Sequence, residues 1–283
     1  MTTPRTTPAS GIQRLGKAAR LGVLLLVWVT LGCRSPRSKP AALTEVFRSE
    51  KLAAIDLAIS QSIASNRCPG GVFWLERNGV VYSKAYGQRS VDPSPEPASL
   101  GTIYDAASLT KVLATAPAVA WLIERGHIDP EKPLAQYLPA FAAHGKEAIT
   151  VRQVLTHASG LRPGLGGGSW SGSEKALELA CDEKPTHPPD TRFVYSDINF
   201  ILLGKLVEKV SGQTLDAFCE AHLYRPLKMR DTSYRPVLHG VPVDRIAPTV
   251  VNNKTYFNLF LNPNEGSRHA LEDLVEQNPR VRK

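Results

Sequence analysis

Two adjacent residues, Asn78 and Gly79, constrain the fold of this chain more than any other feature of its sequence. They separate two short runs, 71–76 and 80–86, in which hydrophobic and aromatic residues are frequent. Asn-Gly is the strongest short signal for a two-residue hairpin turn, because both turn positions need a positive φ angle. The two runs are therefore predicted to form an antiparallel hairpin. Such a hairpin is marginally stable alone, so more strands or a helix must pack against it.

The rest of the chain shows helical patterns. Before the hairpin, apolar residues recur at helical spacing, which predicts an amphipathic helix over 43–66. Pro117 is expected to kink or split the first helix after the hairpin. The helices predicted after the hairpin lie at 112–125, at 150–157, from Ser173 onward, from Asp197 to a Gly212 cap, and at 214–224. A strand pair followed by helices alone predicts an α+β fold, with a helical subdomain over about 125–225 beside a small sheet.

Ser108 and Lys111 are three residues apart where the first of these helices begins. Residues at this spacing share a helix face, so the lysine amine can reach the serine hydroxyl. The unpaired N–H groups of a first helical turn can also hold a developing oxyanion. Burial is expected to lower the pKa of Lys111, so that a neutral amine can take the serine proton. The residues expected to bury it are Leu109, Val112 and Leu113. The alternative is a capping serine followed by a solvated lysine.

The first 40 residues hold seven Lys or Arg residues and no acid, which leaves only +1 of the net charge of +8 for the remainder. Nucleic-acid binding therefore has little support. Arg14, Lys17 and Arg20 precede an apolar run, Leu21 to Leu31. This run is too short for a membrane span of about 20 residues but typical of a secretory signal peptide. The run ends in Gly32-Cys33, which resembles the lipidation box of bacterial lipoproteins, with Thr30 in place of the usual leucine.

These features predict a signal peptide at 1–32, lipidation at Cys33 and a basic tether at 33–42. They also predict export to the bacterial cell envelope, with a lipid anchor in the membrane and the domain facing the periplasm. The alternatives are a simple signal peptide and an uncleaved anchor.

The three remaining cysteines, Cys68, Cys181 and Cys219, permit at most one internal disulfide. Neither they nor the histidines show the spacing of a metal site. The glycine-rich stretch 164–172 is not followed by the Lys-Ser/Thr helix start of a phosphate loop. No metal and no cofactor are predicted.

Several segments together resemble the serine β-lactamase and penicillin-binding-protein superfamily, on the branch that holds class C β-lactamases, DD-carboxypeptidases and related esterases. The matching segments are Ala107–Lys111, Trp121–Gly126 with Tyr137–Pro139, Ile149–Leu161, Tyr195–Asp197 and Pro226–Met229. They follow the family order across roughly residues 50–250. The resemblance implies a β-lactamase/transpeptidase-like α+β fold, in which helices and a helical subdomain flank an antiparallel sheet.

The resemblance also implies roles for the site residues. Ser108 would attack a carbonyl and carry the acyl group, and Lys111 would help to deprotonate it. Tyr195 occupies the tyrosine position of the family's Tyr-x-Asn motif and would relay a proton to the leaving group. Asp197 stands where many relatives have a substrate-binding asparagine, so an amide donor is replaced. His157 is interpreted as satisfying backbone groups under the site. The implied substrates are small molecules or peptidoglycan peptides.

The family's third motif, Lys/His-Thr/Ser-Gly, is not recognisable downstream of Arg245–Thr249, and Lys254-Thr255-Tyr256 has no glycine. We therefore interpret 43–249 as an incomplete hydrolase domain without its C-terminal strands, and 250–283 as a divergent tail. In this form the chain is expected to be a poor catalyst. A truncated, non-catalytic remnant and a peptidoglycan-binding module are the alternatives to a hydrolase. Carboxypeptidase, β-lactamase and esterase activity stay open.

Overall fold

The computed structural model describes residues 42–166 and 170–248. The predicted signal peptide, Cys33, nearly all of the predicted tether and the tail 250–283 lie outside the described residues. Within the described ranges, no helix is both long and apolar enough to cross a membrane.

The sheet is built on the predicted hairpin. Strands β1 (Gly70–Arg77) and β2 (Val80–Ser90) pair antiparallel along the whole of β1. Asn78 and Gly79 connect them with φ angles of 52° and 73°, as a two-residue hairpin turn requires. β2 runs past the predicted end at Tyr86 and pairs with a two-residue strand, β3 (Glu96–Pro97). The result is a three-stranded antiparallel sheet in the order β1-β2-β3.

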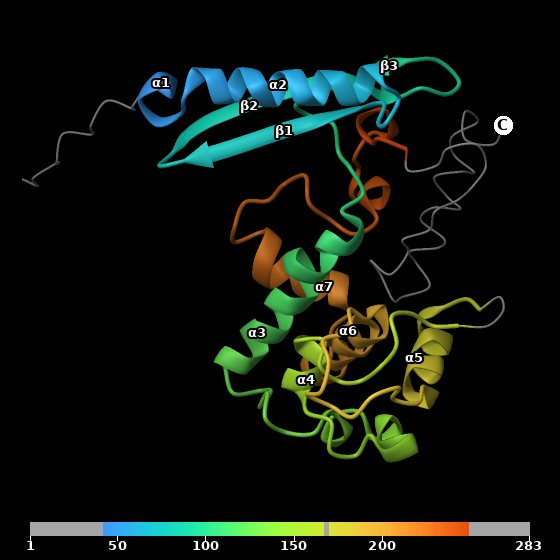
Figure 1. Ribbon diagram of the computed structural model, residues 1–283. Coiled ribbons are helices and arrows are strands. Elements are labelled where there is room, and N and C mark those ends of the chain that lie inside the picture. The colour runs from blue at the N-terminus through green and yellow to red at the C-terminus, as the bar shows by residue number, and fades with distance from the viewer. Residues whose placement is uncertain (1–41, 167–169, 249–283) are drawn as a thin grey trace, which may run out of the picture. The chain divides into compact units, whose positions relative to one another are not determined.

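Two helices precede the sheet, α1 (Leu43–Val46) and α2 (Ser49–Ala64). The prediction of one continuous helix over 43–66 is therefore wrong, because Phe47 has an extended backbone that separates the two. Helix α2 lies along the hairpin, as Figure 1 shows. This packing supplies the partner that an isolated hairpin needs.

The segment around Ser108 contains three kinds of helix. A 3-10 turn (Ala107–Leu109) is followed by a π-helical segment (Lys111–Thr115) and then by helix α3 (Ala116–Glu124). Pro117 lies in the first turn of α3, directly after the π-helical segment. The backbone at Thr115 and Ala116 stays helical, so the helix changes type near Pro117 and is not split there.

The remaining helices form one packed group. They are α4 (Val151–Leu155), α5 (Ser173–Asp182), α6 (Asp197–Ser211) and α7 (Leu215–Cys219). Short 3-10 segments lie at Leu134–Gln136, Pro139–Gly145, Pro236–His239 and Val243–Arg245, and a π-helical segment lies at Glu220–Tyr224. The hydrophobic core runs from Ala114 to Tyr234 and includes residues of α3 to α7.

Helix α6 is the central helix of this group, since nine of its residues are buried. The Ser196 hydroxyl caps its start by accepting a hydrogen bond from the Asn199 N–H, and Gly212 ends it with a left-handed φ of 69°.

A separate contact lies at the end of the described chain. Ile246 forms a parallel bridge with Ile103, and the Ile246 carbonyl accepts a hydrogen bond from Arg89. The predicted α+β class is confirmed, with a small antiparallel sheet and a separate helical core.

Candidate active site

The structure brings Ser108 and Lys111 together. Lys111 Nζ lies 3.3 Å from Ser108 Oγ and donates a hydrogen bond to it. The serine belongs to the 3-10 turn and the lysine begins the π-helical segment, so the predicted pairing is made without a regular α-helix. Ala107, directly before the serine, has a φ of 43°. A residue with a Cβ is strained in this left-handed region, and such strain is concentrated at functional sites.

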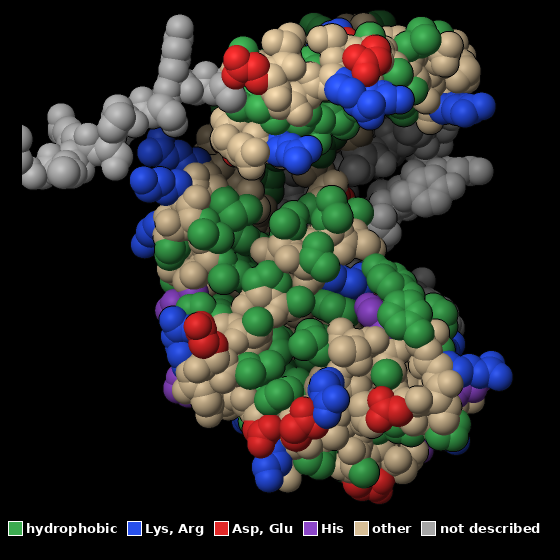
Figure 2. Space-filling view, turned by 60° about the vertical axis from the view of Figure 1, so that its left-hand side comes forward, with side chains coloured by type: hydrophobic (Ala, Val, Ile, Leu, Met, Phe, Trp, Pro, Cys, Tyr) green, Lys and Arg blue, Asp and Glu red, His purple; other side chains and the backbone are tan. Residues whose placement is uncertain are grey.

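The apolar neighbours on the same segment do not bury Lys111. Leu109 and Val112 are each 61% exposed and Leu113 is 41% exposed, whereas the lysine as a whole is 8% exposed. The expectation that these three residues surround the amine is therefore wrong. Hydrophobic side chains are visible on the molecular surface in Figure 2.

Side chains from the first turn of α6, and Tyr195 just before it, surround the amine instead. Lys111 Nζ lies 4.8 Å from the centre of the Tyr195 ring and 5.7 Å from that of Phe200. Asp197 Oδ1 lies 2.6 Å from Nζ and forms an ion pair with it. These contacts join the nucleophile segment to a part of the chain more than 80 residues further on.

The ion pair reverses the expected shift in the pKa of Lys111. Burial, the largest single influence, lowers that pKa, but the contacts of the amine with Asp197 and then Tyr195 raise it by more. The prediction of a lowered pKa is therefore wrong, and Lys111 carries a positive charge at neutral pH. An ammonium group cannot accept a proton, so this state must change before Lys111 can act as a base.

Tyr195 is an accessible part of the site and not a core tyrosine. It is 45% exposed, and its ring lies 4.7 Å from the ring of His157 as well as close to the Lys111 amine. A phenol in contact with the Lys111 amine can exchange a proton with it.

His157 has the supporting role that the sequence predicted. Its Nδ1 accepts the backbone N–H of Ser196 at 3.0 Å, and the Asn199 amide nitrogen lies 3.4 Å from the same atom. Burial lowers the pKa of His157, and the charge of Lys111 lowers it further against the opposing effect of Asp197. A neutral ring is required for this role, because a protonated Nδ1 cannot accept a hydrogen bond.

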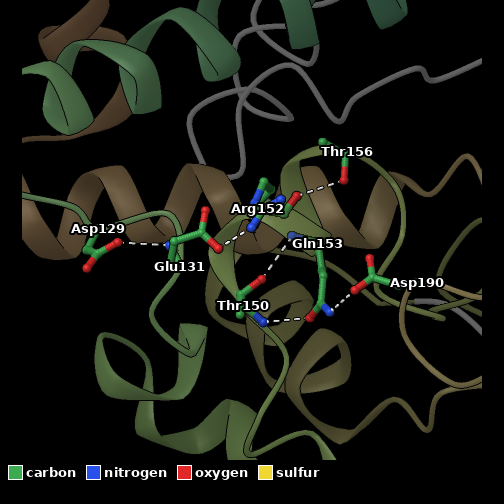
Figure 3. Close-up of polar contacts among 7 residues, drawn as sticks. All are labelled: Asp129, Glu131, Thr150, Arg152, Gln153, Thr156 and Asp190. Carbon is green, nitrogen blue, oxygen red and sulfur yellow. Dashed lines mark hydrogen bonds and ion pairs between the residues drawn. The ribbon is translucent and has the colours of Figure 1, made fainter.

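A polar network at the start of α4 holds the backbone that leads to His157 and Tyr195 (Figure 3). Thr150 and Gln153 form a reciprocal capping box, in which each side chain bonds the backbone N–H of the other. The Gln153 amide also donates to Asp190 Oδ2 at 2.5 Å, and the Asp190 N–H donates to the Ala158 carbonyl. These bonds tie α4 to the loop that carries Tyr195.

Asn199 and Phe200 are two site residues that the sequence reasoning missed. Asn199 is fully buried, and its Oδ1 accepts a hydrogen bond of 2.7 Å from Ser159. A polar residue within the otherwise apolar pattern of α6 is a signal that could have revealed it. Phe200 carries no comparable signal, because an aromatic residue in a helix is usually part of the core.

No group of three or more His, Cys, Asp or Glu side chains within 42–166 and 170–248 could hold a metal ion. Cys68, Cys181 and Cys219 are free thiols, so no disulfide joins them.

Known proteins resemble this chain over most of its length. The family model described as Beta-lactamase matches residues 55–274, which extends beyond the domain end predicted at 249. The "Putative D-alanyl-D-alanine carboxypeptidase" of Escherichia coli (strain K12) is 31% identical over 268 residues, which cover 86% of this chain and 62% of that protein. The N-acetylmuramyl-L-alanine amidase of Bacillus subtilis (strain 168) is 33% identical over 227 residues, or 73% of this chain and 51% of that protein.

A solved structure also resembles this chain. The octameric penicillin-binding protein homologue from Pyrococcus abyssi aligns with a TM-score of 0.63 at 27% identity, over 74% of this chain and 49% of that one. The chain thus spans about half to two thirds of the length of these relatives. Because the family model covers well over half of its residues, this chain belongs to the Beta-lactamase family.

Proposed function

We propose that this chain is a serine hydrolase of the bacterial cell envelope that forms an acyl-enzyme at Ser108. The observation that carries the proposal is the distance of 3.3 Å between Ser108 Oγ and Lys111 Nζ. A serine hydroxyl is a weak nucleophile unless a base lies within hydrogen-bond reach, and Lys111 in its neutral form would be such a base.

The proposed reaction has two stages. In the first, Lys111 in its neutral form takes the hydroxyl proton while Ser108 Oγ bonds to the carbonyl carbon of an amide or ester. Tyr195, which lies close to the amine, passes a proton to the leaving group as its bond to the carbonyl carbon breaks. In the second stage, water gives one proton to the Tyr195 phenolate as its oxygen bonds to the carbonyl carbon of the acyl-serine ester. The bond from that carbon to Ser108 Oγ breaks, Oγ regains its proton from Lys111, and the free acid is released.

The names of the relatives favour a substrate from the cell wall. One relative is named a carboxypeptidase for D-alanyl-D-alanine and another an amidase for N-acetylmuramyl-L-alanine. We therefore propose a peptidoglycan peptide as the first choice, and a β-lactam or a small ester as the alternatives. Asp197, at the entrance of α6 and partly exposed, is the proposed contact for a polar group of the substrate.

Intact-mass measurement after incubation with a penicillin or an activated ester tests the acyl-enzyme. We expect an adduct on the wild-type chain and none on Ser108→Ala. Lys111→Ala and Tyr195→Phe should each slow acylation about 10²–10⁴-fold, which is the usual contribution of a general acid or base. Ser99→Ala and Lys175→Ala, at exposed positions away from the site, are the matched controls. An adduct that persists on Ser108→Ala contradicts the assignment, and no adduct on the wild type favours a non-catalytic remnant.

The leaving group identifies the substrate class once acylation is established. Release of D-alanine from a peptide that ends in D-Ala-D-Ala indicates a carboxypeptidase, while faster turnover of a β-lactam or an aryl ester indicates one of the alternatives.

We further propose export and lipid anchoring at Cys33, from the basic and apolar leader that ends in Gly32-Cys33. Cys33→Ala should release the domain from the membrane fraction, while Cys68→Ala should leave it there. Equal membrane retention of both variants contradicts lipid anchoring.

A further inference from the structure

Asp197 lies closer to the lysine of the candidate site than the serine does. Its Oδ1 is 2.6 Å from Lys111 Nζ, whereas Ser108 Oγ is 3.3 Å from the same nitrogen. The lysine side chain is 10% exposed and that of Asp197 is 29% exposed. Two opposite charges in contact with little intervening water attract each other more strongly than an exposed pair does.

The other surroundings of the amine also favour its charged form. The faces of Tyr195 and Phe200 lie 4.8 and 5.7 Å from Nζ, and aromatic faces attract a cation. His157, behind these rings, accepts a backbone N–H and is therefore uncharged. The side chains that bear on the amine are those of Ser108, His157, Tyr195, Asp197 and Phe200. Asp197 is the negatively charged member of this set.

We infer that Asp197 sets the charge of Lys111 and thereby the pH range in which Ser108 can be acylated, an inference that rests on the proposed function. In the resting site the pair consists of an ammonium and a carboxylate, and the ammonium has no lone pair to accept the serine proton. It must first release one proton to solvent. The free amine then takes the proton of Ser108 while Oγ bonds to the carbonyl carbon.

Acylation therefore rises toward alkaline pH, as the fraction of neutral Lys111 increases. Replacing the carboxylate with an amide of the same shape removes the stabilisation of the ammonium, so the rise moves to lower pH. Asparagine is the residue that the family resemblance places at this position, which makes Asp197→Asn the natural comparison. Asp197 acts through Lys111 here and is a positioning residue.

An NMR titration of the full chain, labelled with ¹³C and ¹⁵N at lysine, measures the charge of Lys111 directly. The Lys111 signal is identified by its absence in Lys111→Arg. We expect Lys111 to lose its proton at lower pH in Asp197→Asn than in the wild type. The control is Asp231→Asn, which removes an exposed carboxylate from its pair with Arg245 and should leave the titration unchanged. The same titration in both Asp197→Asn and wild type overturns the inference.

The wild-type chain alone provides a second test, in case Asp197→Asn does not fold. A Lys111 signal that titrates below the ordinary lysine value of about 10.4 overturns the inference. Acylation by an activated ester, followed across pH in the same samples, separates the two proposals. A shifted titration without any adduct supports the effect of Asp197 on Lys111 and contradicts the hydrolase. An adduct with the same pH profile in both proteins supports the hydrolase and overturns the inference.

Discussion

The helical group and the sheet layer are stabilised in different ways. Helix α6 alone contributes six buried hydrophobic residues to the core, whereas Leu52 and Tyr86 are the buried hydrophobic residues among described positions 42–104. The sheet layer relies more on its turn and on Asp56 of α2, whose carboxylate accepts hydrogen bonds from Tyr82, Lys84 and Tyr86. Apolar burial stabilises by about 25 cal/mol per Å², so the helical group has the larger reserve of stability.

This difference indicates where the molecule opens first. Regions with few buried apolar contacts unfold locally at lower free energy than the core does. Ser108 lies between the two regions in the chain, but its partners Tyr195 and Asp197 belong to the helical group. The site is therefore expected to keep its geometry when the sheet layer opens. We expect hydrogen exchange in β1 and β2 to be faster than in α6, and the following variants test this difference.

The largest loss of stability is expected from a substitution in the helical core. Phe141 is fully buried, so Phe141→Ala leaves a large cavity and should lower the free energy of unfolding by about 3–5 kcal/mol. Urea denaturation measures this loss. Phe193→Ala, at a position 73% exposed, is the matched control and should change stability little. Equal losses from the two variants would show that the core is not the source of stability.

The next effect is confined to the hairpin. Gly79 has a φ of 73° at the turn, and an alanine there is strained by roughly 1–2 kcal/mol. Gly79→Ala should speed hydrogen exchange in β1 and β2 and leave α6 unchanged. Gly71→Ala, in β1 with open space for a Cβ, is the control. Faster exchange in α6 as well as in the hairpin would mean that the two regions unfold together.

A smaller effect is expected at the start of α4. Thr150→Ala removes the side-chain cap and should lower stability by about 1 kcal/mol. Thr156→Ala, at the other end of the same helix, removes a hydroxyl that only donates to the Arg152 carbonyl and should have less effect. Thermal melting compares the two. The ranking is refuted if Thr156→Ala is the more harmful variant.

The smallest effect is a pH dependence in the sheet layer. Hydrogen bonds from Lys84, Tyr82 and Tyr86 lower the pKa of Asp56 from its ordinary value of 3.8 to about 2. A lowered carboxyl pKa stabilises the folded state above the unfolded pKa, and this contribution is lost as pH falls from about 4 toward 2. The wild type should therefore lose more stability than Asp56→Asn between pH 5 and pH 3 in urea unfolding. Parallel losses in both proteins would contradict this role of Asp56.

Local signals in the sequence predicted much of the fold. Asn78-Gly79 indicated the hairpin, Thr150 indicated the start of α4, and Gly212 indicated the end of α6, because each residue acts on its own turn or cap. The break of the first helix at Phe47 and the short strand β3 were missed. Strand β3 depends on its pairing with β2 and not on local propensity.

The sequence predicted which residues form the candidate site, but it did not predict the charge of Lys111. Ser108, Lys111, Tyr195 and Asp197 were named from motifs, and the contacts of Lys111 bring them together. The expected burial of Lys111 by its neighbours was wrong, because the 3-10 turn leaves Leu109 exposed and the π-helical segment leaves Val112 and Leu113 exposed. The charge of the lysine depends on Asp197, which lies far away in sequence, and a local pattern does not report such a contact.

The π-helical segment that leads from Lys111 into α3 changes the direction in which side chains face around the helix axis. A π turn holds more residues than the 3.6 of an α turn, and each residue of an α-helix turns the chain by about 100°. The extra residue lets the Ser108 end face the site while Ala118, Val119 and Leu122 of α3 face the core. Deleting one residue, such as Ala114, would restore a regular helix and force a choice between the two orientations. The segment thus sets the rotation between the turn that carries Ser108 and the buried face of α3.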